Sequence, residues 1–291
     1  MIEVHNPEIV WKNDSRIPGI SAMLRVRNGE DYLKVSLDSV IDQVDEIICV
    51  YNNCQDNTEN ILLEYENKYP SKVKVFKYIP IVYPPNSVDY LNTHPESYHS
   101  LANYYNFALS KCNCEYIFKL DDDEIFFPNI LRNLCTMINE KKCIGLRGIN
   151  VFDLNKKLYV EGFTAGGDTL LFKYDQSCKF IKLDSFESFV KDNMIVIGVA
   201  ICFYHTKFTK VDRGLNNYNL HLNNKCRYEK IFSDNFDKWN NGGLTPYHEY
   251  MNGKSIPNIF DLGFKYMNDS IKKYKYEKFN TLESKLSAVS M

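Results

Sequence analysis

Hydrophobic positions along the first half of the chain follow two alternating spacings. Short apolar runs, typical of buried strands, are separated by segments in which apolar residues recur every three or four positions, as in helices. The apolar runs lie at 17–26, 46–51, 115–120 and 143–151, and residues 73–78 alternate apolar and polar positions, which also predicts a strand. The helical segments lie at 30–41, 58–69, 101–109 and 128–142. This alternation predicts an α/β domain with a mixed, mainly parallel sheet and helices on both faces.

The pattern changes after residue 152. Hairpin strands are expected at 158–163, 169–174 and 194–204, and the chain from residue 211 onward is polar, aromatic and rich in Asn. Residues 80–99 contain four prolines, which exclude a regular element and predict a long functional loop. We therefore expect three parts, namely an N-terminal arm over 1–16, the α/β domain over 17–210 and a helical or irregular C-terminal appendage over 211–291.

Composition narrows the class of protein. The 291 residues are 44% hydrophobic and 25% charged, with a formal net charge of −2, so no strong field favours a nucleic-acid partner. The first residues do not resemble a signal peptide, and the longest apolar run, 194–204, is too short to cross a bilayer. These features predict a cytoplasmic protein. The lysine- and aromatic-rich segment 271–279 is either a solvated helix or a peripheral contact with an anionic membrane.

Four consecutive carboxylates, Asp121, Asp122, Asp123 and Glu124, directly follow the apolar run 115–120. In open α/β sheets, ligands bind at the carboxyl ends of the strands. Adjacent carboxylates repel each other, and a divalent cation such as Mn²⁺ or Mg²⁺ relieves that repulsion, commonly together with substrate phosphates. The Asp-x-Asp spacing therefore predicts a metal–diphosphate site, with Asp121 and Asp123 on the same side. The alternative is a solvated acidic turn that caps the next helix.

Several motifs together resemble family 2-like glycosyltransferases of the GT-A-type, Rossmann-like fold. They are Arg25-Val-Arg-Asn-Gly29, the turn Tyr51-Asn-Asn-Cys-Gln-Asp-Asn-Thr58, and Tyr104-Tyr-Asn-Phe-Ala-Leu109 followed by the strand that ends on Asp121-Asp-Asp123. The resemblance lies in the order and spacing of these motifs together, and it covers about residues 17–210. The resemblance implies a metal-dependent, inverting transfer from a nucleotide-diphosphate sugar, with UDP favoured, to a glycan or lipid-linked acceptor in cell-surface polysaccharide biosynthesis.

The resemblance also implies roles for individual residues. The implied nucleotide contacts are Arg25, Arg27, Asn28, Tyr51, Asp56, Asp121 and Asp122. The implied metal ligands are Asp121, Asp123 and His205, although His205 is equally well explained as a hydrogen-bonded surface histidine. The chain departs from the family at Tyr51, where an Asp is usual and a tyrosine offers a stacking face for the base. A second departure is Tyr105, where relatives often have Arg.

An inverting transferase needs a carboxylate general base near the acceptor hydroxyl. Asp168, between a glycine turn and an apolar run, is the first candidate, and Glu187 is the second. The alternative for Asp168 is closure of a hairpin turn.

Three other functions remain open. A sugar-nucleotide nucleotidyltransferase would need a glycine-rich loop where 25–29 has one glycine, a phosphodiesterase would need a His/Asp ligand set, and a glycan- or cation-binding module would show no turnover.

Overall fold

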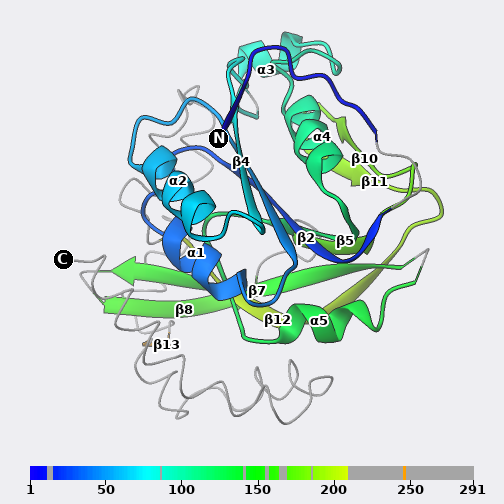
Figure 1. The fold of residues 1–291 in the computed structure, drawn as a ribbon. Helices are drawn as coiled ribbons and strands as arrows, with labels where there is room; N and C mark the ends of the chain where they lie inside the picture. The colour runs from blue at the N-terminus through cyan, green and yellow to red at the C-terminus, as the bar shows by residue number, and fades with distance from the viewer. Residues whose placement is uncertain are drawn as a thin grey trace.

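The computed structural model describes residues 1–11, 16–85, 87–139, 142–154, 157–163, 169–184, 186–208 and 245–246. Their strands form an 11-stranded mixed sheet whose main path runs β1-β4-β3-β2-β5-β9-β7-β12-β6, with β8 pairing with β7 and β13 (Figure 1). The first part of this path is entirely parallel, from β1 to β5. Strand β9 joins the two parts, because it is antiparallel to both β5 and β7.

The elements have the following bounds. The parallel strands are β1 (Ile2–Val4), β2 (Ile17–Val26), β3 (Glu46–Tyr51), β4 (Val73–Tyr78) and β5 (Cys114–Leu120). The other strands of the large sheet are β6 (Glu124–Phe126), β7 (Lys142–Leu154), β8 (Lys157–Phe163), β9 (Thr169–Lys173), β12 (Ile195–Phe208) and β13 (Thr245–Pro246). A separate two-stranded sheet contains β10 (Lys179–Lys182) and β11 (Glu187–Val190). The helices are α1 (Leu33–Val40), α2 (Thr58–Lys68), α3 (Val88–Asn92), α4 (Leu101–Lys111) and α5 (Ile130–Cys135).

Successive residues of the central strands face opposite sides of the sheet and build two cores. Ala22 and Leu24 of β2 pack in one cluster with residues of α1, α2 and α5. Met23, between them in the sequence, packs in a second cluster with residues of α3 and α4. Both faces of the central strands β2 and β3 are therefore largely buried, which explains their nearly continuous apolar sequences. The predicted α/β class, with helices on both faces of the sheet, is confirmed.

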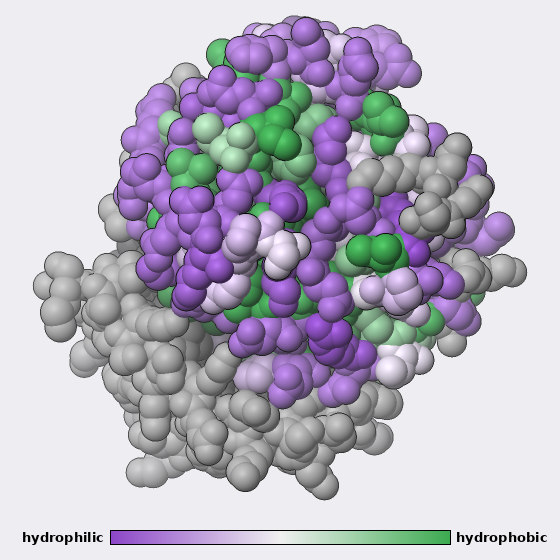
Figure 2. Space-filling view, viewed as in Figure 1, coloured by the Kyte–Doolittle hydropathy of each residue, from purple (hydrophilic) through white to green (hydrophobic). Residues whose placement is uncertain are grey.

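The described surface in Figure 2 is mainly hydrophilic, in contrast to this apolar core. In the view of Figure 2, hydrophilic side chains cover most of the described surface, and hydrophobic ones form separate patches between them. None of the helices in the described ranges is long and apolar enough to cross a membrane.

Four expectations for individual segments were wrong. Residues 2–4 of the predicted arm are not irregular, because β1 extends the sheet beside β4. The helix expected over 128–142 ends at Cys135, after which two i→i−3 backbone bonds form turns instead. The loop 80–99 contains the short helix α3. Strand β12 is not part of a hairpin, since it runs parallel to β7 and antiparallel to β6. The appendage over 211–291 lies outside the described residues apart from 245–246.

Candidate functional site

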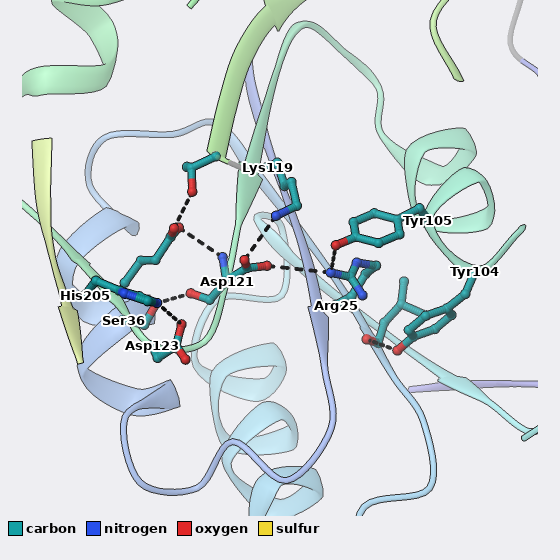
Figure 3. Close-up of polar contacts among 11 residues, drawn as sticks. Arg25, Ser36, Tyr104, Tyr105, Lys119, Asp121, Asp123 and His205 are labelled. Atoms are coloured by element: carbon teal, nitrogen blue, oxygen red, sulfur yellow. Dashed lines mark hydrogen bonds and ion pairs between the residues drawn. The ribbon is translucent and has the colours of Figure 1, made fainter. Parts of the chain in front are cut away.

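The acidic cluster forms a turn between β5 and β6 at the carboxyl edge of the sheet. Strand geometry stops at Leu120, and the Glu124 amide donates to the Asp121 carbonyl at 3.3 Å, closing the turn. Because the strand does not continue, Asp121 and Asp123 do not share one side as expected. Figure 3 shows that their carboxylates point toward different partners.

Asp121 faces two cations. Its carboxylate lies 3.0 Å from Lys119 Nζ and 3.7 Å from Arg25 Nη2. The Ser36 hydroxyl donates to its carbonyl at 3.1 Å. Burial by itself raises the pKa of Asp121, but Lys119 and Arg25 outweigh burial and leave the pKa below its ordinary value. Asp121 is therefore ionised, and its charge is already balanced by protein side chains.

Asp123 faces His205 instead. Its Oδ1 lies 3.7 Å from His205 Nε2, and the Asp123 residue is 7% exposed. The β12–β6 ladder explains this juxtaposition, because it places His205 directly opposite Glu124. The amide and hydroxyl of Thr206 both donate to the Asp123 carbonyl, at 2.8 and 3.0 Å, and fix the turn against β12.

These two side chains fit a divalent cation. A carboxylate oxygen and an imidazole nitrogen are ordinary ligands of Mn²⁺, and substrate phosphates and water commonly complete such a site. Among the described residues, no group of three or more His, Cys, Asp or Glu side chains gathers as a ready-made metal site. Of the three predicted ligands, the structure brings together Asp123 and His205, whereas Asp121 points to Arg25 and Lys119.

Glu124, the last member of the cluster, has a structural role. It is 4% exposed, accepts the Asp121 amide at 3.2 Å and contacts the Thr169 hydroxyl. Burial, followed by the charge of Asp121, raises the pKa of Glu124 well above its ordinary value. Burial thus favours the protonated form of this carboxyl, and its two contacts help to hold the turn.

Asp122 packs against the first loop at Gly29. A Cβ atom at residue 29 would lie 2.7 Å from Asp122 Oδ2 and 2.6 Å from Val26 Cγ2. Only glycine permits this approach, so the motif 25–29 ends on Gly for a steric reason. The predicted nucleotide contact of Asp122 stays a prediction.

The loops after β2 and β3 are tied to each other. The Asn28 side chain accepts the Gln55 amide at 2.8 Å, and Asn28 adopts a left-handed φ of 51°. Asp56 accepts the amides of Glu30 and Thr58, each at 3.0 Å, and so begins helix α2. Arg27 is half-buried, and its Nε has no hydrogen-bond partner. Arg27, Asn28 and Asp56 thus lie in one pair of loops, where their contacts with a nucleotide stay predictions.

Tyr51 requires a correction. Its side chain belongs to the core cluster beneath α1 and α2, is 1% exposed, and donates from its hydroxyl to the Met1 sulfur at 2.9 Å. A ring buried in this way offers no face to a base. The proposed stacking interaction is therefore not available in this arrangement.

The two candidates for the general base have different outcomes. Asp168 lies outside the described residues. Glu187 opens β11, and its Oε2 is buried without a hydrogen-bond partner. Its charge contributes to raising the pKa of both Arg25, which pairs with Asp121, and Tyr105. Glu187 is thus the candidate that the described structure brings to the site.

Sequence reasoning missed Lys119 and the role of Tyr105. Lys119 is 7% exposed within β5, and its position in an otherwise apolar strand, two residues before an Asp, was an available signal. Tyr105 is 3% exposed, and the Arg25 guanidinium lies 3.2 Å from its ring centroid and donates to its hydroxyl. No sequence pattern indicated that a residue of α4 would meet one of β2.

The profile of the β-1,4-N-acetylgalactosaminyltransferase (CgtA) family matches residues 12–240 of this chain. The chain belongs to the CgtA family. Membership confirms the predicted enzyme class, a glycosyltransferase, and sets aside the nucleotidyltransferase, phosphodiesterase and non-catalytic alternatives. No curated protein matches the chain in sequence.

Solved structures resemble this CgtA-family chain only distantly. Residues 1–349 of TarS from S. aureus, in complex with UDP, match with a TM-score of 0.43 and 14% identity, over 93% of this chain and 88% of TarS. Glucosyl-3-phosphoglycerate synthase from Mycobacterium tuberculosis, in complex with Mn²⁺, UDP and its product, matches with a TM-score of 0.30 and 17% identity, over 44% of this chain and 43% of that one. The assignment of site residues therefore depends on the geometry of this chain.

Proposed function

We propose that this protein is a metal-dependent, inverting transferase that moves N-acetylgalactosamine from a UDP-sugar to a hydroxyl of a glycan or lipid-linked acceptor. The observation that carries the proposal is the pairing of Asp123 with His205 at 3.7 Å at the edge of the sheet, beside the cations that flank Asp121. The chemistry of a departing diphosphate needs positive charge at such a place.

Asp123 and His205 would hold the Mn²⁺ or Mg²⁺ ion, which neutralises charge on the diphosphate when bound. Arg25 and Lys119 add two protein cations a few ångströms away, at Asp121. Their side chains are 14% and 8% exposed, so solvent screens them weakly. The negative charge that develops on the leaving group is then stabilised by groups already in position, which costs no reorganisation during the reaction.

The β-1,4 linkage in the name of the family supports an inverting course for the proposed transfer. A β-linked product formed from an α-linked UDP-sugar requires attack on the face of the anomeric carbon opposite the leaving group. A carboxylate on that face removes the proton of the acceptor hydroxyl. Glu187 suits this role because its Oε2 is buried and has no protein partner to compete with the acceptor. Asp168 is the second candidate.

The proposed acceptor is a hydroxyl of a glycan or of a lipid-linked sugar. A lipid-linked acceptor and a peripheral contact at the inner face of the membrane would involve segment 271–279, which lies outside the described residues. A cell-surface polysaccharide as the product is an extension of the same proposal.

The test is UDP release from UDP-N-acetylgalactosamine, with a panel of p-nitrophenyl hexosides as acceptors and proton NMR of the product. We expect Mn²⁺-dependent release of UDP, loss of activity in EDTA, and a β-linked product. Asp123→Ala and His205→Ala should each lower kcat/KM at least about 100-fold, as for the loss of one group that stabilises the transition state. Asp42→Ala, at an exposed carboxylate, is the matched control. Full activity in EDTA, or an α-linked product, would contradict the proposal.

A further inference from the structure

The small sheet β10–β11 is attached to helix α4 by specific contacts. The Asn106 side-chain amide donates to the Phe180 carbonyl at 2.8 Å and its oxygen accepts the Phe180 amide at 2.7 Å. The neighbouring ring of Tyr105 stacks on the Phe180 ring, with centroids 4.4 Å apart and an interplanar angle of 21°. Two consecutive residues of α4 thus fix the position of β10.

The pairing register of β10 with β11 determines where Glu187 lies relative to α4. Phe180 pairs with Phe189, and Lys182 pairs with Glu187. Because the antiparallel ladder fixes β11 relative to β10, the docking of Phe180 on α4 also fixes where Glu187 lies. The candidate base is therefore placed by a hairpin that lies outside the large sheet.

Tyr105 also contacts the donor side of the site. Arg25 lies over its ring and donates to its hydroxyl (Figure 3). Since a guanidinium can only donate, the Tyr105 oxygen is the acceptor and the phenol keeps its own hydrogen to give. Burial raises the pKa of Tyr105 well above its ordinary value, Arg25 opposes that effect, and the charge of Glu187 adds to it. The hydroxyl therefore stays protonated, and Glu187 lies on the same face of the hairpin as Phe180, on which the Tyr105 ring stacks.

We propose that Tyr105 is a positioning residue, whose hydroxyl accepts from Arg25 and donates to Glu187, so that the donor-side cation and the base are held at one fixed separation. This inference rests on the proposed function, because it takes Glu187 as the base. One Glu187 oxygen would be held by Tyr105, which leaves Oε2 for the acceptor hydroxyl. A purely structural tyrosine would affect folding and leave the chemical step unchanged.

A double-mutant cycle tests this role, with Tyr105→Phe, Glu187→Gln and the combined variant assayed for UDP release from UDP-N-acetylgalactosamine. Tyr105→Phe keeps the ring on Phe180 and under Arg25 and removes only the hydroxyl. We expect kcat to fall about 10- to 100-fold, with the dissociation constant for UDP within about 3-fold, since misplacement of a catalytic group affects the chemical step. The combined variant should be no slower than Glu187→Gln, because both changes remove the same function.

Tyr65→Phe is the matched control. Tyr65, in α2, is also buried, and its hydroxyl bonds to Asp38 and to the Lys34 carbonyl, both in α1. It should lose stability in urea unfolding and keep wild-type kcat. Wild-type enzyme that releases no UDP would refute the proposed function. Active wild-type enzyme in which the Tyr105 and Glu187 effects multiply, or in which Tyr105→Phe keeps full kcat, would overturn this inference alone.

Discussion

At the scale of single residues, neighbouring carboxylates of one motif have different electrostatic environments. Asp121 is held ionised by Lys119 and Arg25, whereas burial raises the pKa of Glu124, three residues later. Asp123, between them, faces His205. From the sequence alone, the consecutive carboxylates appear equivalent. In the structure, β5 ends at Leu120, and the side chains that follow point toward different strands.

The raised pKa of Glu124 predicts how substitutions there behave. Glu124→Gln should change the free energy of unfolding by less than about 1 kcal/mol, because the amide oxygen can accept the Asp121 amide while the Thr169 hydroxyl turns to accept from the NH₂ group. Glu124→Ala leaves a cavity and an unpaired Asp121 amide, and should cost about 2–4 kcal/mol. Urea unfolding at pH 7 measures both values. Equal losses for Gln and Ala would contradict a neutral Glu124.

At the scale of elements, the attachment of β10–β11 is the feature that sequence patterns did not reveal. Strand β3 begins and ends where its apolar run predicted, at 46–51, because both faces of this central strand are buried and the pattern is strong. Strand β4 begins and ends at 73–78, as its alternation of apolar and polar positions predicted. Strands β10 and β11 are four residues each, with mixed burial, and give no clear period. Their position depends on Asn106, whose contact partner is 74 residues away.

Asn106→Ala tests the attachment of this hairpin. The substitution removes both hydrogen bonds with Phe180 and leaves a half-buried backbone amide and carbonyl unpaired, which should cost about 2–4 kcal/mol. Hydrogen exchange should accelerate over 179–190 and stay unchanged in α2. Asn60→Ala, which removes one exposed bond to Asn57, is the control and should cost less than about 0.5 kcal/mol. Unchanged exchange over 179–190 in Asn106→Ala would show that other contacts hold the hairpin.

A second attachment predicts a dependence on pH. Lys191, whose side chain is 0% exposed just after β11, forms an ion pair with Asp175 and donates to the Lys173 carbonyl at 2.7 Å. Burial raises the pKa of Asp175, but hydrogen bonds from Lys191 and Ser177 outweigh it and leave the pKa below its ordinary value. A carboxyl with a lowered folded pKa stabilises the fold above its unfolded pKa of about 3.9, and loses that effect as the pH falls.

We therefore expect Asp175→Asn to be less stable than wild type at pH 7, and the difference to vanish toward about pH 2–3. Urea midpoints measured across this range provide the test. Asp192→Asn, at an exposed carboxylate in the same turn region, is the control and should show no such convergence. A difference that persists at low pH would mean that Asp175 contributes through packing and not through its charge.

At the scale of the whole molecule, the fold separates structural and chemical roles. Two buried clusters hold the parallel strands between α1 and α2 on one face and α4 on the other. The β2–α1, β3–α2 and β5–β6 connections then meet at one edge, where the CgtA-family enzyme would hold its donor. The class of fold was predictable because strand–helix alternation is repeated through half of the chain. The pairing of Asp123 with His205 was not predictable from spacing, because it depends on the register of β12 against β6.

This arrangement predicts a metal-linked gain in stability on nucleotide binding. A ligand that binds only the folded protein, when present at about 100 times its dissociation constant, stabilises it by about 2.7 kcal/mol, equivalent to roughly 4 °C in Tm for a chain of this size. We expect UDP with Mn²⁺ to give a shift of that order in thermal denaturation. UMP with Mn²⁺ should give less, because it lacks the β-phosphate that the metal and the cations at Asp121 would contact. In Asp123→Ala, the Mn²⁺-dependent part of the shift should disappear, while any shift produced by UDP alone remains. An equal shift in wild type and Asp123→Ala would place the metal elsewhere in the protein.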